Sequence, residues 1–347
     1  LDPVFNSATT EYSCTVKNNV TSVTVNAIAT SSKSKVRGLG AKELTVGKNT
    51  LPIRVIAEDG SEKIYNVNVT RKAGATSLKN EIMKNTVITA NPTLTTSSNN
   101  TSDASGLYKS TATNTGNPTY YFRGNVENNY VSFAGQTWRI VRINEDGTIR
   151  LIMQDGINNN ANIVFNSNYN NYTYMYYTNS NAKTTLESWY QTNIGSKSDL
   201  AKNVASGNYY CEQAKAKSDD SYTSENATMI AYNKYTPDFK CTTDGNGKGA
   251  VNANVGLLTY DETVYAGGYY NLINSNYYLY NSIINWWTMS PAGIYFSNSR
   301  VWYVNSNGTI DRNGVDVIHA IRPVLNLTAN IQISSGDGTK ENPFVVE

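Results

Sequence analysis

The sequence predicts a multidomain protein, with an all-β sandwich followed by a larger α+β domain. Three observations lead to this fold class. The first 72 residues consist of short alternating runs rich in β-branched residues, separated by turn signals. Residues 73–119 lose that pattern, and from residue 120 strand patterns return with helical patterns between them.

Residues 1–72 contain five predicted strands. The runs are EYSCTV, SVTVNAIA, KELTV, NTLPIRVIAE and KIYNVNVTR, and the turn signals between them are KNN, RGLG, VGKN and EDGS. The stretch EDGSEKIY predicts a tight hairpin with Asp59 and Gly60 at its turn.

Residues 73–119 are predicted to link the two domains. The run AGATSLKNEIMKN can form a short helix that places Leu78, Ile82 and Met83 on one side. The polar stretch after it, ending in NTGNPT, is predicted to be a long loop.

Residues 120–347 are predicted to form a twisted antiparallel sheet with a few helices. The strand runs are TYYFRG, NYVSFAG, QTWRIVRIN and TIRLIMQ, and the turn NEDG joins the last two. Helical patterns follow in AKTTLESWYQTNI, SDLAKNVAS and TYDETVYAGG. In the third of these, Thr259 and Glu262 have the spacing of a capping box.

The composition is that of a neutral, β-rich exterior protein. Charged residues make up only 16% of the chain, and its polarity comes from Asn, Ser, Thr and Gly beside 26 Tyr. We therefore expect an extracellular location, at a cell surface or secreted. The net charge of +2 and the lack of a basic stripe argue against a nucleic-acid partner. No run of 18 apolar residues is present, so we expect no direct membrane insertion by this piece.

The three cysteines leave two readings open. A bridge between Cys211 and Cys241 would close a loop of about 30 residues and stabilise the fold by roughly 3–4 kcal/mol. The alternative is two separately buried thiols. Cys14 lies in a strand pattern and is predicted to be a small buried side chain. With no C-x-x-C pair, no Cys/His cluster and no D-x-D-x-D-G loop, we predict no metal and no cofactor.

The first domain resembles a known family. The pieces that carry the likeness are Pro3, Phe5 and Tyr12 at the entry, the LTVGKN turn, and the hairpin VIAEDGSEKIYNVNVTR. These are similar to the bacterial cadherin-like β-sandwich domain, an Ig/cadherin-like fold. The resemblance implies a structural spacer without catalytic residues.

A second resemblance covers roughly residues 107–346. GLLTYDETVYAGG, WWTMSP and AIRPVLNL, together with GQTWRIVRINEDGTIRLI, resemble in order the C-type-lectin-like fold of formylglycine-generating enzymes and of surface proteins of gut Firmicutes. Those enzymes use reactive cysteines near the C-terminal motif. Here no cysteine follows Cys241, so the resemblance does not carry over their chemistry, and we expect no enzyme.

The non-catalytic branch of that fold implies a binding face, in some proteins diversified by a retroelement. There, variable residues such as Asn, Tyr, Ser, Asp, His, Ile and Arg lie on a rigid frame. The frame candidates are Trp286, Trp287, Pro291, Trp302, Arg322 and Pro323. The ligand-binding candidates are Tyr277, Tyr278, Tyr280, Ser282, Ile283, Ile284, Ile294, Tyr295, Ser297, Asn298, Asp311, Arg312, Asp316, Ile318 and His319.

The predicted function is therefore adhesion or ligand recognition through this Tyr/Asn/Ser-rich face, because tyrosine offers large contact area at low entropic cost. The expected partner is a protein or glycan on another cell, a phage or a host surface. One alternative is a stalk or filament subunit that self-associates. Another is a glycan-active enzyme, which would need two carboxylates facing a cleft. His319 is the only histidine, and no partner motif for a catalytic role accompanies it.

Overall fold

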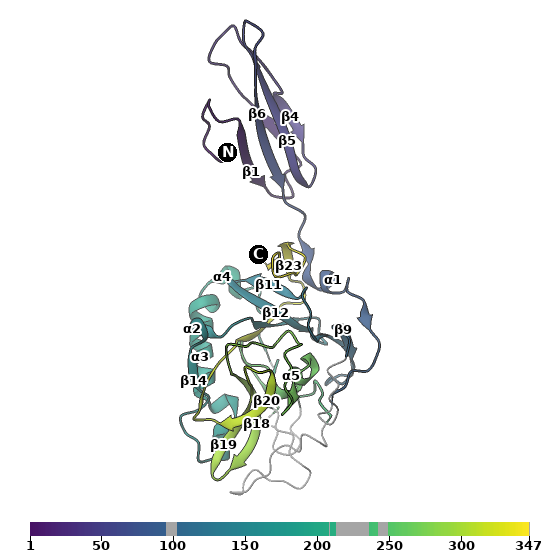
Figure 1. Cartoon of the computed structure of the whole chain (residues 1–347), viewed down its shortest axis with the longest axis vertical. Coiled ribbons are helices and arrows are strands. Elements are labelled where there is room, and N and C mark those ends of the chain that lie inside the picture. Colours follow the sequence, from purple (N-terminus) through teal and green to yellow (C-terminus); the bar gives the residue numbers. More distant parts are fainter. Residues whose placement is uncertain (95–102, 208, 213–235, 242–248, 347) are drawn as a thin grey trace. The chain divides into compact units, whose positions relative to one another are not determined.

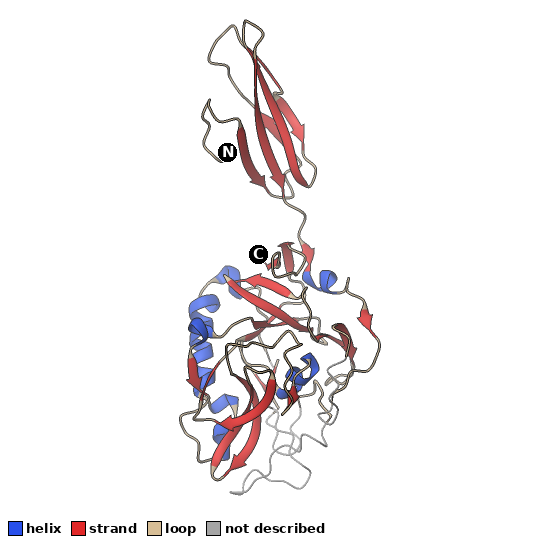
Figure 2. Cartoon of the chain, in the orientation of Figure 1, coloured by secondary structure: helices blue, strands red, loops and turns tan. Residues whose placement is uncertain are grey.

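The computed structural model describes residues 1–94, 103–207, 209–212, 236–241 and 249–346. The chain divides into two compact units. The first comprises Leu1–Thr76 with Ile333–Ser335, and the second comprises Ser77–Gln332 and Gly336–Glu347. Strands dominate both units, and the helices are few and short (Figure 2).

The first unit is a β-sandwich, as predicted. Its strands are β1 (Glu11–Val16), β2 (Ser22–Val25), β3 (Lys35–Arg37), β4 (Gly40–Glu43), β5 (Gly47–Ile56) and β6 (Glu62–Arg71). One sheet has the order β1-β6-β5-β3, and β2 pairs with β4 in the other (Figure 1). Alternate side chains of the two sheets meet in a core that includes Tyr12, Val25, Leu51 and Val69. Cys14 is half-buried, unpaired and packed against this core.

The β5–β6 hairpin turns at Asp59-Gly60, as predicted. Ala57 N donates to Ser61 O at 2.9 Å, and Gly60 has a φ of 85°, which a residue with a side chain adopts only at a cost.

The larger sheet of the second unit is built around β12 (Gln136–Ile143). This strand pairs with β11 (Tyr130–Phe133), β13 (Ile149–Met153) and the end of β10 (Thr119–Arg123). Outside these strands lie β8 (Val87–Ile88), β9 (Gly106–Ser110), β22 (Val324–Leu327) and β24 (Phe344–Val346). The NEDG turn joins β12 to β13, as predicted. Two further short strands are β7 (Thr76–Ser77) and β23 (Gln332–Ser335).

The smaller sheet of the second unit has the order β14-β21-β18-β19-β20-β17. Its strands are β14 (Asn162–Val164), β17 (Tyr269–Tyr270), β18 (Trp286–Tyr295), β19 (Asn298–Val304), β20 (Thr309–Gly314) and β21 (Ile318–Ala320). A two-stranded pair, β15 (Tyr210–Cys211) and β16 (Ala250–Val251), stands apart. Cys211 and Cys241 form a disulfide, with their Cα atoms 5.3 Å apart. Of the two predicted alternatives, the structure therefore has the bridge and not two separate thiols.

Helices form at the four predicted helical runs, whereas the helical turns at residues 157–160, 172–175 and 177–179 were not predicted. The helices are α1 (Leu78–Ile82), α2 (Ile157–Asn160), α3 (Asn181–Tyr190), α4 (Ser198–Ala201) and α5 (Tyr260–Ala266), with 3-10 turns η1 (Tyr172–Met175) and η2 (Tyr177–Asn179) and a π turn η3 (Gln191–Gly195). The capping box at the start of α5 is confirmed. Thr259 Oγ1 accepts from Glu262 N at 3.1 Å, and Glu262 Oε2 accepts from Thr259 N at 3.1 Å.

One predicted boundary differs from the structure. The described residues of 77–119 belong to the second unit and do not link two domains, and residues 95–102 of the predicted loop lie outside the described residues. Helix α1 buries Leu78 and Ile82, and β9 pairs along its length with β10. The reason is that the apolar residues of this stretch are few but well placed, and a strand of five residues is too short for its pattern to stand out in a polar sequence.

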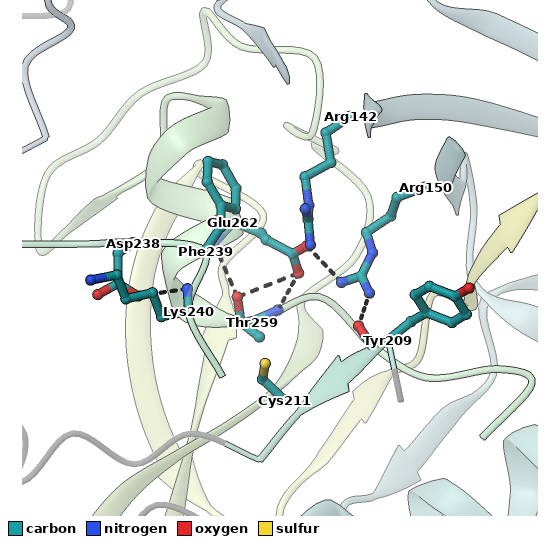
Figure 3. Close-up of a pocket in the computed structure, with 9 residues that line it drawn as sticks. All are labelled: Arg142, Arg150, Tyr209, Cys211, Asp238, Phe239, Lys240, Thr259 and Glu262. Carbon is teal, nitrogen blue, oxygen red and sulfur yellow. Dashed lines mark hydrogen bonds and ion pairs between the residues drawn. The ribbon is translucent and has the colours of Figure 1, made fainter. Parts of the chain in front are cut away.

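A buried ion-pair cluster holds α5 against the larger sheet (Figure 3). Glu262 Oε1 lies 3.1 Å from Arg142 Nε on β12 and 2.6 Å from Arg150 Nη1 on β13. Arg150 also donates to the carbonyl oxygen of Tyr209. Burial alone would raise the pKa of Glu262, but Arg150 and Arg142 outweigh it, and the pKa lies below its usual value. The carboxylate stays ionised because two cations and a helix N-terminus face it.

The small hollow beside this cluster is therefore structural. Its lining includes Cys211, Asp238 and Lys240. The two arginines of the cluster donate hydrogen bonds to Glu262, to the carbonyl oxygen of Tyr209 and to the Thr119 hydroxyl. Guanidinium groups that already donate to protein oxygens have few hydrogen-bond donors left for a ligand.

Replacing Glu262 by Gln should destabilise the second unit by about 3–5 kcal/mol, because it leaves two buried arginines without a counter-charge. Urea unfolding measures this loss. The matched control is Glu187→Gln, which removes one half of a partly exposed pair with Lys183 and should cost at most about 1 kcal/mol. Equal losses in the two variants would contradict the role given to Glu262.

Candidate functional site

The β18–β19 hairpin ends in a turn with an unusual sequence. Tyr295 pairs with Asn298, so the loop has only two residues, Phe296 and Ser297. Their φ angles are 46° and 60°, as in a type I′ turn. Such turns strongly favour Asn-Gly, because a side chain is strained at positive φ. The turn therefore carries a phenylalanine where local stability would select against one.

Exposed aromatic rings gather at this turn. Phe296 is 81% exposed and Tyr295 is 47% exposed, and their ring centroids lie 4.4 Å apart in a T-shaped pair. The Arg300 guanidinium lies over the Tyr295 ring at 4.5 Å, which fixes one face of that ring. The two rings present a large apolar area that is already ordered.

Ser299 joins two further segments to this end of the sheet. Its N–H donates to Tyr169 O at 2.7 Å, its hydroxyl donates to Asn171 O at 2.5 Å, and its carbonyl accepts from Val315 N at 2.9 Å. Asn298 Nδ2 also donates to Asp316 Oδ1 at 3.2 Å. The exposed side chains of these segments form what we call the hairpin-end surface, defined by Tyr169, Tyr295, Phe296, Ser297, Asp316, Val317 and Ile318.

The structure places the predicted ligand-binding residues in three environments. Exposed ones are Ser282, Ile283, Tyr295, Ser297, Asp316 and Ile318, and half-buried ones are Tyr280, Asn298, Asp311 and Arg312. Buried ones are Tyr277, Tyr278, Ile284, Ile294 and His319.

The five buried residues are corrections to the predicted face. Tyr277 and Tyr278 are 2% and 3% exposed, and the Tyr277 hydroxyl donates inward to Gly308 O. Ile284, just before β18, and Ile294 on β18 are 6% and 9% exposed. Side chains without solvent contact offer no surface to a partner, so these residues build the frame instead.

The predicted frame residues are all buried. They are Trp286, Trp287, Pro291, Trp302, Arg322 and Pro323. Arg322 donates from Nε to Met153 O and from Nη1 to Leu279 O, each at 2.9 Å, so it ties loop carbonyls to the end of β13. The Trp287 indole donates to Ile163 O at 3.1 Å.

His319 is held between two rings. Its imidazole stacks on Tyr303 at 4.4 Å and tilts against Trp287 at 4.5 Å. Burial lowers its pKa from 6.5 to about 4, and a backbone hydrogen bond at Ile318 opposes that shift. A neutral, packed imidazole is a frame component.

Three members of the hairpin-end surface escaped sequence reasoning: Tyr169, Phe296 and Val317. For Phe296 a signal existed, because the Phe296-Ser297 pair stands between two strand-like runs and contains neither the Gly nor the Asn that a tight turn favours. Tyr169 begins an aromatic-polar run, residues 169–181, that could stack on sugar rings, but nothing local places Tyr169 or Val317 beside the hairpin, because long-range hydrogen bonds to Ser299 bring their segments there.

Two polar hollows lie along α3. One is lined in part by Tyr176, Lys183 and Glu212, and the other by Thr184, Glu187 and Gln191. Glu212 accepts from Thr178 N, and Glu187 pairs with Lys183. Each hollow has one carboxylate among its described lining residues, whereas glycoside hydrolysis needs two facing one cleft. Across the described ranges, no three His, Cys, Asp or Glu side chains cluster in a way that would hold a metal ion.

Comparisons with known proteins identify two family models. The model described as "Cadherin-like beta sandwich domain" matches residues 1–72, and that described as "Domain of unknown function (DUF6273)" matches residues 147–329. No curated protein matches the chain, and no solved structure does. The chain belongs to the second family, whose model covers more than half of it, and its N-terminal domain is cadherin-like.

The cadherin-like domain suggests an extracellular or surface protein. Among the described residues, no helix has the length and apolar character that crossing a membrane requires.

Changing His319 to Phe should flatten the pH dependence of stability in acid. The folded chain keeps His319 neutral down to about pH 4, whereas the unfolded chain protonates it near pH 6.5. The unfolded state therefore binds more protons in this window, and stability falls as pH drops, by on the order of 3 kcal/mol. Phenylalanine retains the ring stack and removes the titration. Urea unfolding at several pH values compares the two proteins, and an identical acid slope would show that His319 does not titrate as described.

Proposed function

We propose that this member of the family is an extracellular bacterial surface protein that binds a partner non-covalently through the hairpin-end surface. The partner is a protein or glycan on another cell, a phage or a host surface. The cadherin-like domain serves as a spacer. The C-terminal domain, on this proposal, is C-type-lectin-like, and its recognition residues sit on a frame that retroelement-directed diversification can leave intact.

The observation that carries the proposal is the strained, exposed Phe296–Ser297 turn. Two residues with side chains at positive φ cost on the order of 1–3 kcal/mol each, and the costly side chain is an 81% exposed phenylalanine. Local stability and local solubility both select against this choice. A contact made outside the chain would offset that cost.

The surroundings of the turn support the same interpretation. Tyr295 and Phe296 supply ordered aromatic area, Val317 and Ile318 supply apolar area, and Ser297 and Asp316 supply polar groups that adapt to a partner. Beneath them Trp287, Trp302 and Arg322 are buried and fixed, so little entropy is lost on binding.

A stalk or filament subunit is the second candidate. The feature that favours it is the exposed apolar area itself, which a second copy of the chain would cover as well as a foreign partner would. Mass measurement in solution over a range of concentrations separates the two. A monomer at all concentrations favours a foreign partner, and growth with concentration favours self-association.

The double variant Phe296→Asn, Ser297→Gly should gain stability and lose binding. Asparagine and glycine suit the two positive φ angles, so we expect a gain of about 1–2 kcal/mol in urea unfolding. Flow cytometry of the fluorescently labelled chain on panels of bacterial and mammalian cells measures binding, and we expect at least a tenfold loss on the cells that the wild type labels.

The matched control is Ile273→Asn, which removes a 68% exposed apolar side chain that is not part of the hairpin-end surface. It should bind as the wild type does. A double variant that is more stable and binds equally well would refute the assignment of this surface.

A further inference from the structure

Two arginines lie on one face of the smaller sheet, next to the hairpin-end surface. Trp302 on β19 stands opposite Arg312 on β20, and Arg300 lies two residues from Trp302 on the same strand. Side chains two apart on a strand share a face, and directly opposed residues do so as well. The two positive charges repel each other. Burial, and after it the charge of Arg312, lower the pKa of Arg300.

These arginines differ from the other inward-facing arginines of the second unit. Arg123, Arg139, Arg142, Arg150 and Arg322 each donate to carbonyl, carboxylate or side-chain oxygens, although Arg322 Nη2 is also buried without an acceptor in the described part of the chain. Arg300 Nε and Arg312 Nη1 are buried with no acceptor in the described part of the chain. The indole N–H of Trp302, between them in the register, also has no acceptor there.

In the described part of the chain, each of the two guanidinium groups lies over an aromatic ring. Arg300 lies 4.5 Å from the Tyr295 centroid, and Arg312 lies 5.4 Å from the Tyr270 centroid. Asp311 attracts Arg300, but its Oδ1 accepts from Arg312 N at 2.8 Å. Among the described residues, no carboxylate forms an ion pair with either guanidinium group, so two cations and a third donor lie together in an arrangement that an incoming anion would complete.

We propose that Arg300 and Arg312 bind a carboxylate carried by an Asp or Glu side chain of a protein partner. This inference rests on the proposed function, because it names the charge of the partner that the hairpin-end surface contacts. Tyr295 belongs to that surface and also stacks on Arg300, so the apolar and the charged parts are continuous.

The make-up of the surface favours a protein over an acidic glycan. Tyrosine and arginine are the residues that most often dominate protein–protein binding energy, and here they adjoin exposed Phe296, Val317 and Ile318. An aliphatic rim suits the apolar side chains of a protein better than the hydroxyls of a sugar. The guanidinium groups, which donate in a plane, match the two oxygens of a carboxylate.

Nuclear magnetic resonance of the full chain, labelled with nitrogen-15, tests the site with acetate as the probe. The indole N–H signal of Trp302 should shift in a saturable way with acetate. In Arg300→Gln and Arg312→Gln the apparent affinity should fall at least tenfold, because each removes one charged donor set. The control is Lys109→Gln, which removes an exposed positive charge on β9, in the other sheet. We expect it to bind acetate as the wild type does.

Two polymeric probes then identify the source of the carboxylate. We expect hexaglutamate peptide to shift the same signal at lower concentration than acetate, with hexaglutamine inert and polygalacturonate weaker than hexaglutamate. Binding of polygalacturonate alone would overturn the assignment to a protein partner. No saturable shift with acetate, or a shift that survives in both arginine variants, would overturn the site itself.

The Phe296→Asn, Ser297→Gly variant separates this inference from the proposed function. It retains both arginines and Tyr295, so it should bind acetate like the wild type even though it loses cell binding. If it binds cells normally while the arginine variants lose acetate, the proposed surface is wrong but the carboxylate site stands.

Discussion

The second unit depends on buried guanidinium groups. Its loops are long and irregular, and their carbonyl oxygens need donors that a hydrophobic interior cannot supply. Arginines supply them. Arg123 on β10 reaches Val264 O and Tyr265 O at the end of α5, and Arg139 reaches Val126 O. In the Glu262 cluster one carboxylate balances two further buried arginines, Arg142 and Arg150, inside the fold.

Tight packing at the base of the β18–β19 hairpin explains how the hairpin-end surface tolerates backbone strain. The turn sits at the end of two strands whose other ends carry fully buried Trp286, Trp287 and Trp302. Packing of that kind over-determines the backbone, so an unfavourable pair of φ angles at the tip is offset by the burial beneath it. Rigidity at the base and exposure at the tip are two results of one arrangement.

Much of the fold could be predicted from the sequence, for physical reasons that differ by region. The sandwich strands are half-buried, so their period-two pattern is visible, and β1 has the bounds of the EYSCTV run. The NEDG turn and the Thr259 capping box are local chemistry and are legible without the fold. The short pairing of β8 with β9 involves residues twenty apart and leaves no local pattern.

The candidate site was only partly predictable, because tyrosine and isoleucine occur both in the buried core and on the binding surface of a protein. Tyr277 and Tyr295 have the same side chain and opposite environments: Tyr277 lies in a loop with its hydroxyl donating to Gly308 O, whereas Tyr295 ends β18 at the hairpin tip. Frame residues were easier, since Trp and the Arg-Pro step have few roles outside a core. Arg300 escaped notice because an isolated arginine in a strand looks like an ordinary solvated charge until its neighbours are known.

The backbone at the hairpin tip restricts what evolution can place there. At positions 296 and 297, β-branched side chains clash with their own carbonyls, whereas Asn, Asp, Gly and Ser are accommodated with less strain. The backbone φ angles therefore limit which amino acids a varying sequence can place at these two positions, independently of any partner. Asparagine belongs to that set, so a bulky residue at either position gives up backbone stability that asparagine would retain.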